Sequence, residues 1–229
     1  MVIRVEVWSD FVCPFCYIGK RRLDLALAQF SHGDEVVVEF KSFELDPGSP
    51  RETTKSIHEV LAEKYGMSVA EAQRTNAGLA KHAESVGLVY RFDSMQPTNT
   101  FDAHRLVKFA KSFGKDAELT ERLFSAYFTE SKNISDADTL AEVAEGVGLS
   151  RAEALKVIQD KNAFANDVRI DEAIARQIGV SGVPFFVVNQ RYSISGAQPT
   201  ETFIDALDKV WEEQFASPAL PNMSRKCKP

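Results

Sequence analysis

Strand signals lie only near the two ends of this chain of 229 residues, and this most limits the folds available to it. Residues 2–8 alternate Val and Ile with polar side chains, and residues 35–45 form a second β-rich stretch. The segment that starts at Pro14 has apolar residues near helical spacing, and Pro is tolerated in the first turn of a helix. This order predicts a β-α-β unit, whose crossover is almost always right-handed and joins parallel strands.

Residues 50–179 show no convincing strand signal. They divide at residues typical of helix starts, such as Ser68 before one apolar run. Ser150 with Glu153 three residues later has the pattern of a capping box before another run. No linker composition and no internal repeat is present. These features predict a large all-helical segment inserted between the two strand-bearing ends.

Strands return at residues 183–188 and 191–195, and the intervening Asn189-Gln190 predicts a tight hairpin turn because Asn tolerates positive φ. A last helix is expected from about residue 199 to residue 211. The predicted fold class is therefore α/β. The expected domains are a discontinuous strand-bearing domain of residues 1–48 and 180–216, a helical insertion domain of residues 49–179, and a loose tail of residues 217–229.

The composition argues against several classes of function. A net charge of −6 gives no reason to expect nucleic acid, whose binding needs clustered Lys and Arg. No apolar run approaches the roughly 18 to 20 residues that span a bilayer, and the N-terminus lacks the apolar region of a secretory signal. Three cysteines are too few for a disulfide framework. We therefore expect a cytoplasmic protein with no membrane partner.

The sequence CPFC places Cys13 and Cys16 at the junction of the first strand and the first helix. A helix N-terminus carries about half a positive charge, which favours a thiolate over a thiol. The thiolate attacks a disulfide, and a second thiol resolves the mixed disulfide. We expect Cys13 to be the solvent-exposed nucleophile and Cys16, one turn into the helix, to be the buried resolving thiol.

Two other interpretations of the pair remain open. A Cys-X-X-Cys motif is also half of a zinc site, but zinc needs four ligands. The remaining cysteine, Cys227, lies in the tail, and the four histidines are scattered, so no metal site is expected. The pair could also be two inert core cysteines. Cys227 itself is expected to be incidental, with a third redox thiol as the alternative.

The sequence GVPFFV helps to decide between a redox-active pair, a zinc site and two inert cysteines. Pro184 opens a strand after the insertion, where a thioredoxin-type fold places a cis-proline that faces the cysteine pair. Only about 5% of X-Pro bonds in folded proteins are cis, and a trans proline at a strand edge is the alternative. Together with the β-α-β unit, the CPFC motif and the following hairpin, the position favours a cis Val183–Pro184 bond.

Four motifs together resemble a known family. CPFCYIG after the first strand, NTFDAHRL in the insertion, and SGVPFFVVN followed by SGAQP are similar to the DsbA-like thioredoxin-fold family, in particular its cytoplasmic FrnE-type branch. The resemblance covers about residues 3–215. It implies a thioredoxin-like domain split by a helical domain, dithiol–disulfide exchange at Cys13 and Cys16, and Pro184 as the cis-proline.

Further candidate residues surround this pair. Asn99 and His104 match the NTFDAHRL motif, and that helix is expected to direct His104 toward the cysteines. The alternative is that Asn99 or Thr100 caps the helix and His104 packs between the domains. Glu44, near the end of the second strand, is a candidate proton relay or a solvated strand end.

Residues next to the reactive groups are expected to tune the pair. Pro14 and Phe15 lie between the cysteines, and Phe15 offers an apolar contact. Val183, which precedes the proline, is expected to present its backbone to a substrate.

Three functions follow from these expectations. The first is a thiol–disulfide oxidoreductase that acts on protein or small-molecule thiols and needs no bound cofactor, with glutathione as a candidate co-substrate. The second is a glutathione-dependent isomerase of the related kappa type, but those proteins generally carry Ser where this chain has Cys13. The third is a chaperone or binding module that would function without either cysteine.

Overall fold

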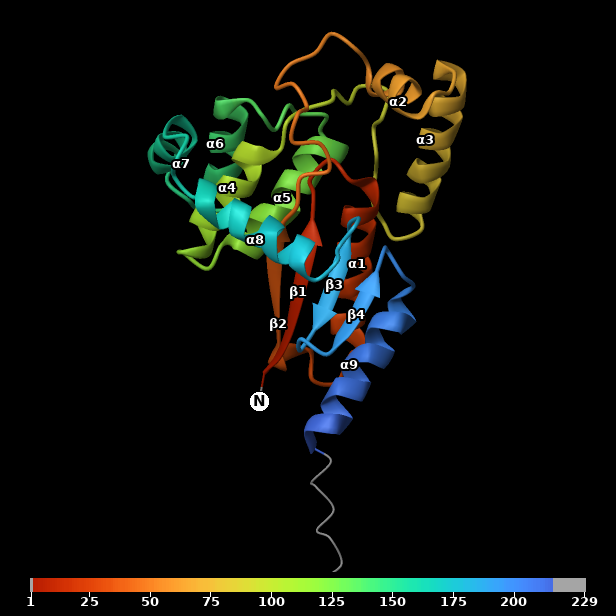
Figure 1. The fold of residues 1–229 in the computed structure, drawn as a ribbon, viewed down its shortest axis with the longest axis vertical. Helices are drawn as coiled ribbons and strands as arrows, with labels where there is room; N and C mark the ends of the chain where they lie inside the picture. Colours follow the sequence, from red (N-terminus) through yellow and green to blue (C-terminus); the bar gives the residue numbers. More distant parts are fainter. Residues whose placement is uncertain (1, 216–229) are drawn as a thin grey trace, which may run out of the picture.

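The two ends of the chain form a mixed sheet (Figure 1), and the computed structural model describes residues 2–215. The strands are β1 (Ile3–Ser9), β2 (Val36–Ser42), β3 (Phe185–Val188) and β4 (Tyr192–Ser195). Their order in the sheet is β2-β1-β3-β4. β1 pairs parallel with β2, from Ile3 opposite Val36 onward, and antiparallel with β3. This arrangement confirms the predicted thioredoxin-like α/β fold with a helical insertion.

Helices cover both faces of the sheet. On one face, α1 (Pro14–Gln29) and α9 (Thr200–Phe215) bury Val5 and Val7 of β1 together with Phe186. On the other face, α8 (Ala165–Gln177) contributes Ala175 beside the buried Trp8. Alternate residues of a strand point to opposite faces, so this short strand supports two separate apolar cores.

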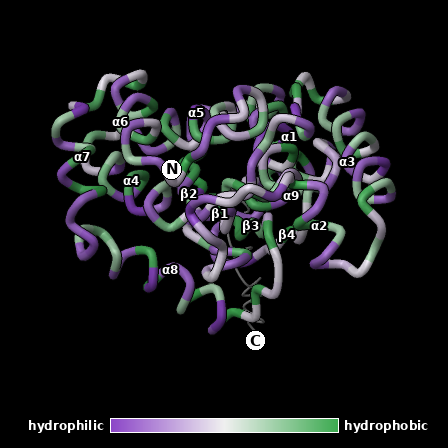
Figure 2. Tube along the Cα trace, turned by 90° about the horizontal axis from the view of Figure 1, so that it is seen from above, coloured by the Kyte–Doolittle hydropathy of each residue, from purple (hydrophilic) through white to green (hydrophobic). Residues whose placement is uncertain are grey.

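The described part of the insertion contains six further helices between β2 and α8. They are α2 (Ile57–Tyr65), α3 (Val69–Glu84), α4 (Phe101–Lys111), α5 (Asp116–Phe128), α6 (Ala137–Glu145) and α7 (Arg151–Gln159). Helices α4, α6 and α7 lie on one side of the molecule and the α2–α3 pair lies on the other (Figures 1 and 2). The start of α1 packs into the core formed by the insertion.

Local signals set several boundaries, with two differences from the sequence analysis. The turn residues Asn189 and Gln190 have positive φ, which confirms the predicted hairpin. The capping-box pattern at Ser150 is only half formed: its side chain accepts from the backbone N–H of Glu153, and the return bond is not made. Complete capping boxes begin α2 at Ser56 and α3, and the sequence analysis had not singled out α2.

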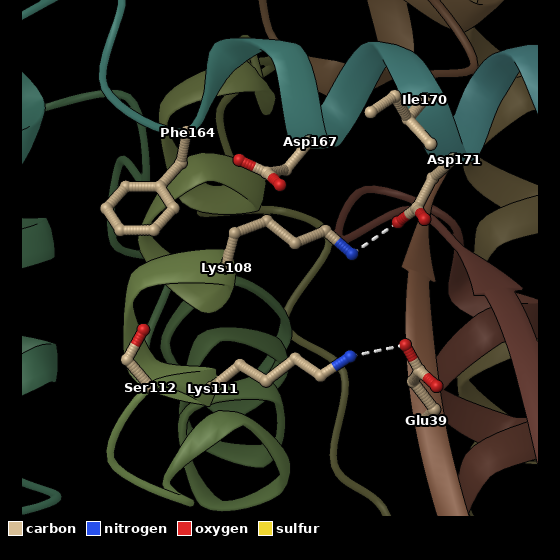
Figure 3. Close-up of a pocket in the computed structure, with 8 residues that line it drawn as sticks. All are labelled: Glu39, Lys108, Lys111, Ser112, Phe164, Asp167, Ile170 and Asp171. Carbon is tan, nitrogen blue, oxygen red and sulfur yellow. Dashed lines mark hydrogen bonds and ion pairs between the residues drawn. The ribbon is translucent and has the colours of Figure 1, made fainter.

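An ionic layer ties the insertion to the sheet (Figure 3). Lys108 and Lys111 extend from α4 and pair with Asp171 of α8 and Glu39 of β2, around a cavity of about 320 Å³. Asp171 also accepts a hydrogen bond from the backbone N–H of Ser42 at 2.8 Å. The side chains of Lys108 and Asp171 are only 9% and 7% exposed, so the Lys108 charge depends on Asp171 for compensation, whereas Asp171 also has Lys41 Nζ at 4.0 Å.

The pair at Asp171 yields a stability prediction. Asp171→Ala should lower the free energy of unfolding by about 3–5 kcal/mol, because it leaves the Lys108 ammonium unpaired in a poorly solvated position. Urea unfolding measures the change.

The matched control is Asp138→Ala. Asp138 pairs with Arg151 at 2.7 Å, but its side chain is 79% exposed. Its removal should cost less than about 1 kcal/mol. Equal losses in the two variants would show that burial does not govern the Asp171 pair.

Within residues 2–215, none of the helices combines the length and apolar character required of a membrane span.

Candidate active site

The cysteine pair lies at the N-terminus of α1. Cys13 is the N-cap residue of the helix, and its side chain makes no capping hydrogen bond. Pro14 occupies the first helical position, where its missing N–H costs no hydrogen bond. The Cys16 N–H donates to the Cys13 carbonyl at 3.0 Å, which brings the second thiol one turn into the helix. Both thiols are free.

Cys13 is less exposed than the sequence analysis expected. It is only 5% exposed, close to the 2% of Cys16, so the expectation of a solvent-facing first cysteine was wrong. The reason is tertiary: the first turn of α1 packs into the core of the insertion rather than facing solvent. Tyr90, which lies between α3 and α4, donates from its hydroxyl to the Pro14 carbonyl at 2.7 Å.

The loop before β3 lies against the pair. The Val183–Pro184 bond is cis, the isomer expected from the sequence. The Cys13 thiol lies 3.5 Å from the Val183 carbonyl oxygen, to which it donates. Helix α1 approaches this loop closely because Gly19 has no side chain: a Cβ there would be 3.0 Å from Pro184 Cγ. Val183 therefore contacts the thiol through its backbone.

A buried polar group lies behind Cys16. The Asp10 N–H donates to Cys16 Sγ at 3.5 Å. The Asp10 carboxylate accepts from the Leu45 N–H at 2.8 Å and lies 3.3 Å from His104 Nε2. His104 packs on the ring of Phe11, with centroids 4.8 Å apart. His104 therefore reaches the cysteine pair through Asp10, without a contact of its own.

The environment of Cys16 disfavours its thiolate. Burial raises the pKa of the Cys16 thiol well above its ordinary value of 9.0, and the hydrogen bond and charge interaction with Cys13 raise it further. The Asp10 N–H acts in the opposite direction because it donates to the sulfur. In the reduced pair, Cys16 is therefore a proton-bearing thiol at neutral pH.

Two predicted residues serve other contacts. The Asn99 side chain accepts from the Phe101 N–H at 3.0 Å and donates to the Ser49 carbonyl at 3.1 Å. It thus fixes the start of α4 and a neighbouring loop. Glu44 pairs with Arg169 at 2.5 Å, and burial raises the pKa of its carboxyl despite that pair. No interaction joins Glu44 to Cys16 in the part of the chain that the structure describes.

A largely apolar cavity of about 550 Å³ opens beside the pair. Cys13, Pro14, Phe15 and Val183 form part of its wall, whereas Cys16 does not. Phe15 is 41% exposed and lies edge-on to His82. The structure thus brings five of the predicted residues together around Cys13: Pro14, Phe15, Cys16, Val183 and Pro184.

Sequence reasoning missed Asp10 and Tyr90. Asp10 had one available signal, a polar residue between the first strand and the apolar Phe11 next to the motif. Tyr90 had no such signal, because its position in the sequence does not reveal that its hydroxyl contacts Pro14. Among residues 2–215, no group of three or more His, Cys, Asp or Glu side chains is arranged to hold a metal ion. Cys227 lies outside the described residues.

The raised pKa of Cys16 can be tested by alkylation. In a Cys13→Ser, Cys227→Ser double variant, Cys16 should react slowly at neutral pH and accelerate only well above pH 9.0, because burial remains the main cause of its shift. Iodoacetamide incorporation, followed by mass spectrometry across pH, measures this.

The matched variant is Cys16→Ser, Cys227→Ser, which keeps Cys13 on the cavity wall and should be alkylated faster at neutral pH. An inflection for Cys16 at or below its ordinary pKa would contradict the buried-thiol interpretation.

Comparisons with known proteins agree with this geometry. The probable DsbA oxidoreductase SCO1869 of Streptomyces coelicolor is 41% identical to this chain, with a TM-score of 0.88. The match covers 99% of this chain and 97% of the SCO1869 chain. The uncharacterized protein YwbO of Bacillus subtilis is 28% identical over 90% of this chain and 96% of its own. A 2-hydroxychromene-2-carboxylate isomerase has a similar fold, with 18% identity, coverage of 92% and 97%, and a TM-score of 0.70. The family described as the DSBA-like thioredoxin domain matches residues 4–208. The chain therefore belongs to the DSBA-like thioredoxin domain family.

Proposed function

We propose that this protein is a thiol–disulfide oxidoreductase in which Cys13 attacks and Cys16 resolves. The observation that carries the proposal is the difference between the two thiols. Cys13 caps a helix and lines a cavity, whereas Cys16 is buried one turn further on, with a raised pKa. Membership of the DSBA-like family, with 41% identity to a probable DsbA oxidoreductase, supports the same function.

The reaction balances with these two thiols alone. The Cys13 thiolate attacks one sulfur of a substrate disulfide, whose other sulfur leaves as a thiolate and takes up a proton. Cys16 then loses its proton and attacks the Cys13 sulfur. The mixed disulfide breaks, the Cys13–Cys16 disulfide forms, and the substrate leaves as a thiol. Two electrons pass from the protein to the substrate, and the reverse sequence oxidises a substrate dithiol.

Several finer assignments belong to the same proposal. The motifs around Cys13 and Pro184 favour the FrnE-type branch of the family, and the scarcity of cysteines favours the cytoplasm. The domain boundaries proposed are residues 1–48 with 180–216, and residues 49–179. The kappa-type isomerase shares the fold, but the thiol at Cys13 favours dithiol exchange over that alternative.

His104 has a positioning role in this proposal. It holds the Asp10 carboxylate, and the Asp10 N–H donates to Cys16 Sγ. A backbone N–H that points at sulfur stabilises the thiolate more than the thiol. The Asp10–His104 contact therefore assists the step in which Cys16 loses its proton.

The two cysteines should fail differently when replaced. Cys13→Ser should form no mixed disulfide with a disulfide substrate, because the nucleophile is gone. Cys16→Ser should accumulate a covalent adduct on Cys13, because no internal thiol releases it. Intact mass and a non-reducing gel detect the adduct, and a small thiol should reverse it. Adducts on Cys16 in the Cys13→Ser variant would show that the roles are reversed.

Replacing His104 should slow only the second step. His104→Leu removes the contact with Asp10 and should lengthen the life of the mixed disulfide about tenfold, in line with a hydrogen bond to a charged group. The first attack should keep its rate. Stopped-flow mixing with a disulfide, followed by acid quenching, separates the two steps.

The conservative control is His104→Gln, whose amide N–H₂ can donate to Asp10 in place of the imidazole. It should recover most of the wild-type resolving rate. Equal defects in the Leu and Gln variants, or a defect in the first attack, would limit His104 to a packing role.

A further inference from the structure

The cavity beside Cys13 is built mainly by the insertion. Helices α2 and α3 form one wall, the segment before α4 forms another, and the start of α1 with Val183 closes one end. In Figure 1 the α2–α3 pair lies beside the start of α1. Its volume of about 550 Å³ falls in the range of roughly 300–1,000 Å³ typical of small-molecule sites.

The wall is apolar and carries almost no charge. Its side chains include Ile57, Leu61, Leu79, Phe92, Met95 and Tyr127. The charged lining residues are Asp46 and Lys64, whose side chains are about half exposed and lie 3.7 Å apart. They compensate each other at the solvent side, so the interior offers no counter-ion for a charged ligand.

Among the polar lining residues, which also include Ser49, Thr75 and Thr98, Asn76 is held in place by its contact with His58. His58 Nε2 lies 3.0 Å from the Asp93 carboxylate, so this nitrogen carries the proton. The other ring nitrogen, Nδ1, then accepts from the Asn76 amide N–H₂ at 3.0 Å. Asn76 lines the cavity and is only 2% exposed. Its Oδ1 accepts no hydrogen bond from any residue within 2–215.

The cavity gives a substrate access to the Cys13 thiol. A residue that is 5% exposed offers little surface to a protein disulfide approaching from bulk solvent. Cys13 does form part of the cavity wall, whereas Cys16 does not. A sulfur atom that enters the cavity therefore meets the nucleophile and not the resolving thiol.

We propose that the cavity binds an uncharged, largely apolar small-molecule disulfide, which presents a sulfur to Cys13 and a hydrogen-bond donor to Asn76 Oδ1. This inference rests on the thiol–disulfide oxidoreductase function proposed above and specifies its substrate class. Cys13 breaks the ligand's S–S bond and releases one half as a thiol. Cys16 then forms the Cys13–Cys16 disulfide and releases the other half, so the two electrons come from the protein dithiol.

A single-turnover experiment tests the substrate class. The reduced full-length protein is mixed with bis(para-aminophenyl) disulfide, which is uncharged at neutral pH and carries amine donors, or with oxidised glutathione, which is charged. Loss of protein thiols gives the rate. The aromatic disulfide should react at least about tenfold faster, after correction for the reaction of each probe with a small free thiol.

Filling the cavity should remove that preference. Leu79→Trp places a larger ring in the wall and should slow the aromatic disulfide by about tenfold or more, and oxidised glutathione clearly less, because the charged probe gains little from the apolar interior. The matched control is Gln73→Trp, an exposed position on the same helix, which should change neither rate. Equal slowing of both probes by Leu79→Trp would overturn the assignment of the cavity.

The role of Asn76 has its own readout. Asn76→Leu should slow bis(para-aminophenyl) disulfide and leave diphenyl disulfide, which has no donor, unchanged. A purely structural role would slow both compounds, and this outcome would overturn the contact with Oδ1. Thermal unfolding checks that the variant is folded, and Leu79→Trp tests the cavity independently of it.

The remaining outcomes distinguish a failure of the proposed substrate class from a failure of the proposed thiol–disulfide oxidoreductase function. A reduced protein that reacts with neither disulfide contradicts the oxidoreductase function itself. A protein that reduces oxidised glutathione at least as fast as the aromatic disulfide keeps the function and overturns the substrate class. A third probe is a peptide disulfide with a flanking aromatic side chain. If this peptide reacts faster than the small aromatic disulfide and Leu79→Trp slows it, the cavity binds a protein segment, and the proposed substrate class is wrong.

Discussion

The packing of the first turn of α1 into the helical insertion is the contact on which the site depends. Tyr17 stacks on Phe124 of α5, with centroids 5.0 Å apart and rings 7° from parallel. Further along the same helix, Leu23 and Ala26 belong to the core between α1, α9 and the sheet. One helix therefore takes part in two apolar cores, and the boundary between them falls just after the cysteine pair.

This shared helix explains the unequal chemistry of two neighbouring thiols. Because the first turn is covered by the insertion, Cys16 loses contact with water and its thiolate is disfavoured. Cys13 is covered as well, but the insertion leaves a cavity on its side of the helix. In the function proposed above, the insertion thus determines both which thiol a substrate meets and what kind of substrate reaches it.

A similar fold is found in proteins with different chemistry, so the fold alone does not decide the reaction. The similarity to a 2-hydroxychromene-2-carboxylate isomerase shows the shared architecture, whereas the reaction depends on the groups at the start of α1. Two free thiols, a carbonyl from the loop of Pro184 and a backbone N–H from Asp10 are the groups assembled here. They suit the exchange of electrons between sulfur atoms.

The sequence by itself determined the order along the chain of the strands and of the helices other than α2, the position of the cysteine pair at a helix start and the place of Pro184, because these depend on local spacing and propensity. Only the tertiary structure decided that Cys13 is buried and that Glu44 pairs with Arg169. It also decided that His104 reaches Cys16 through Asp10, a residue 94 positions away. The physical reason is that burial and long-range hydrogen bonds depend on how the insertion docks on α1, and no local periodicity encodes that docking.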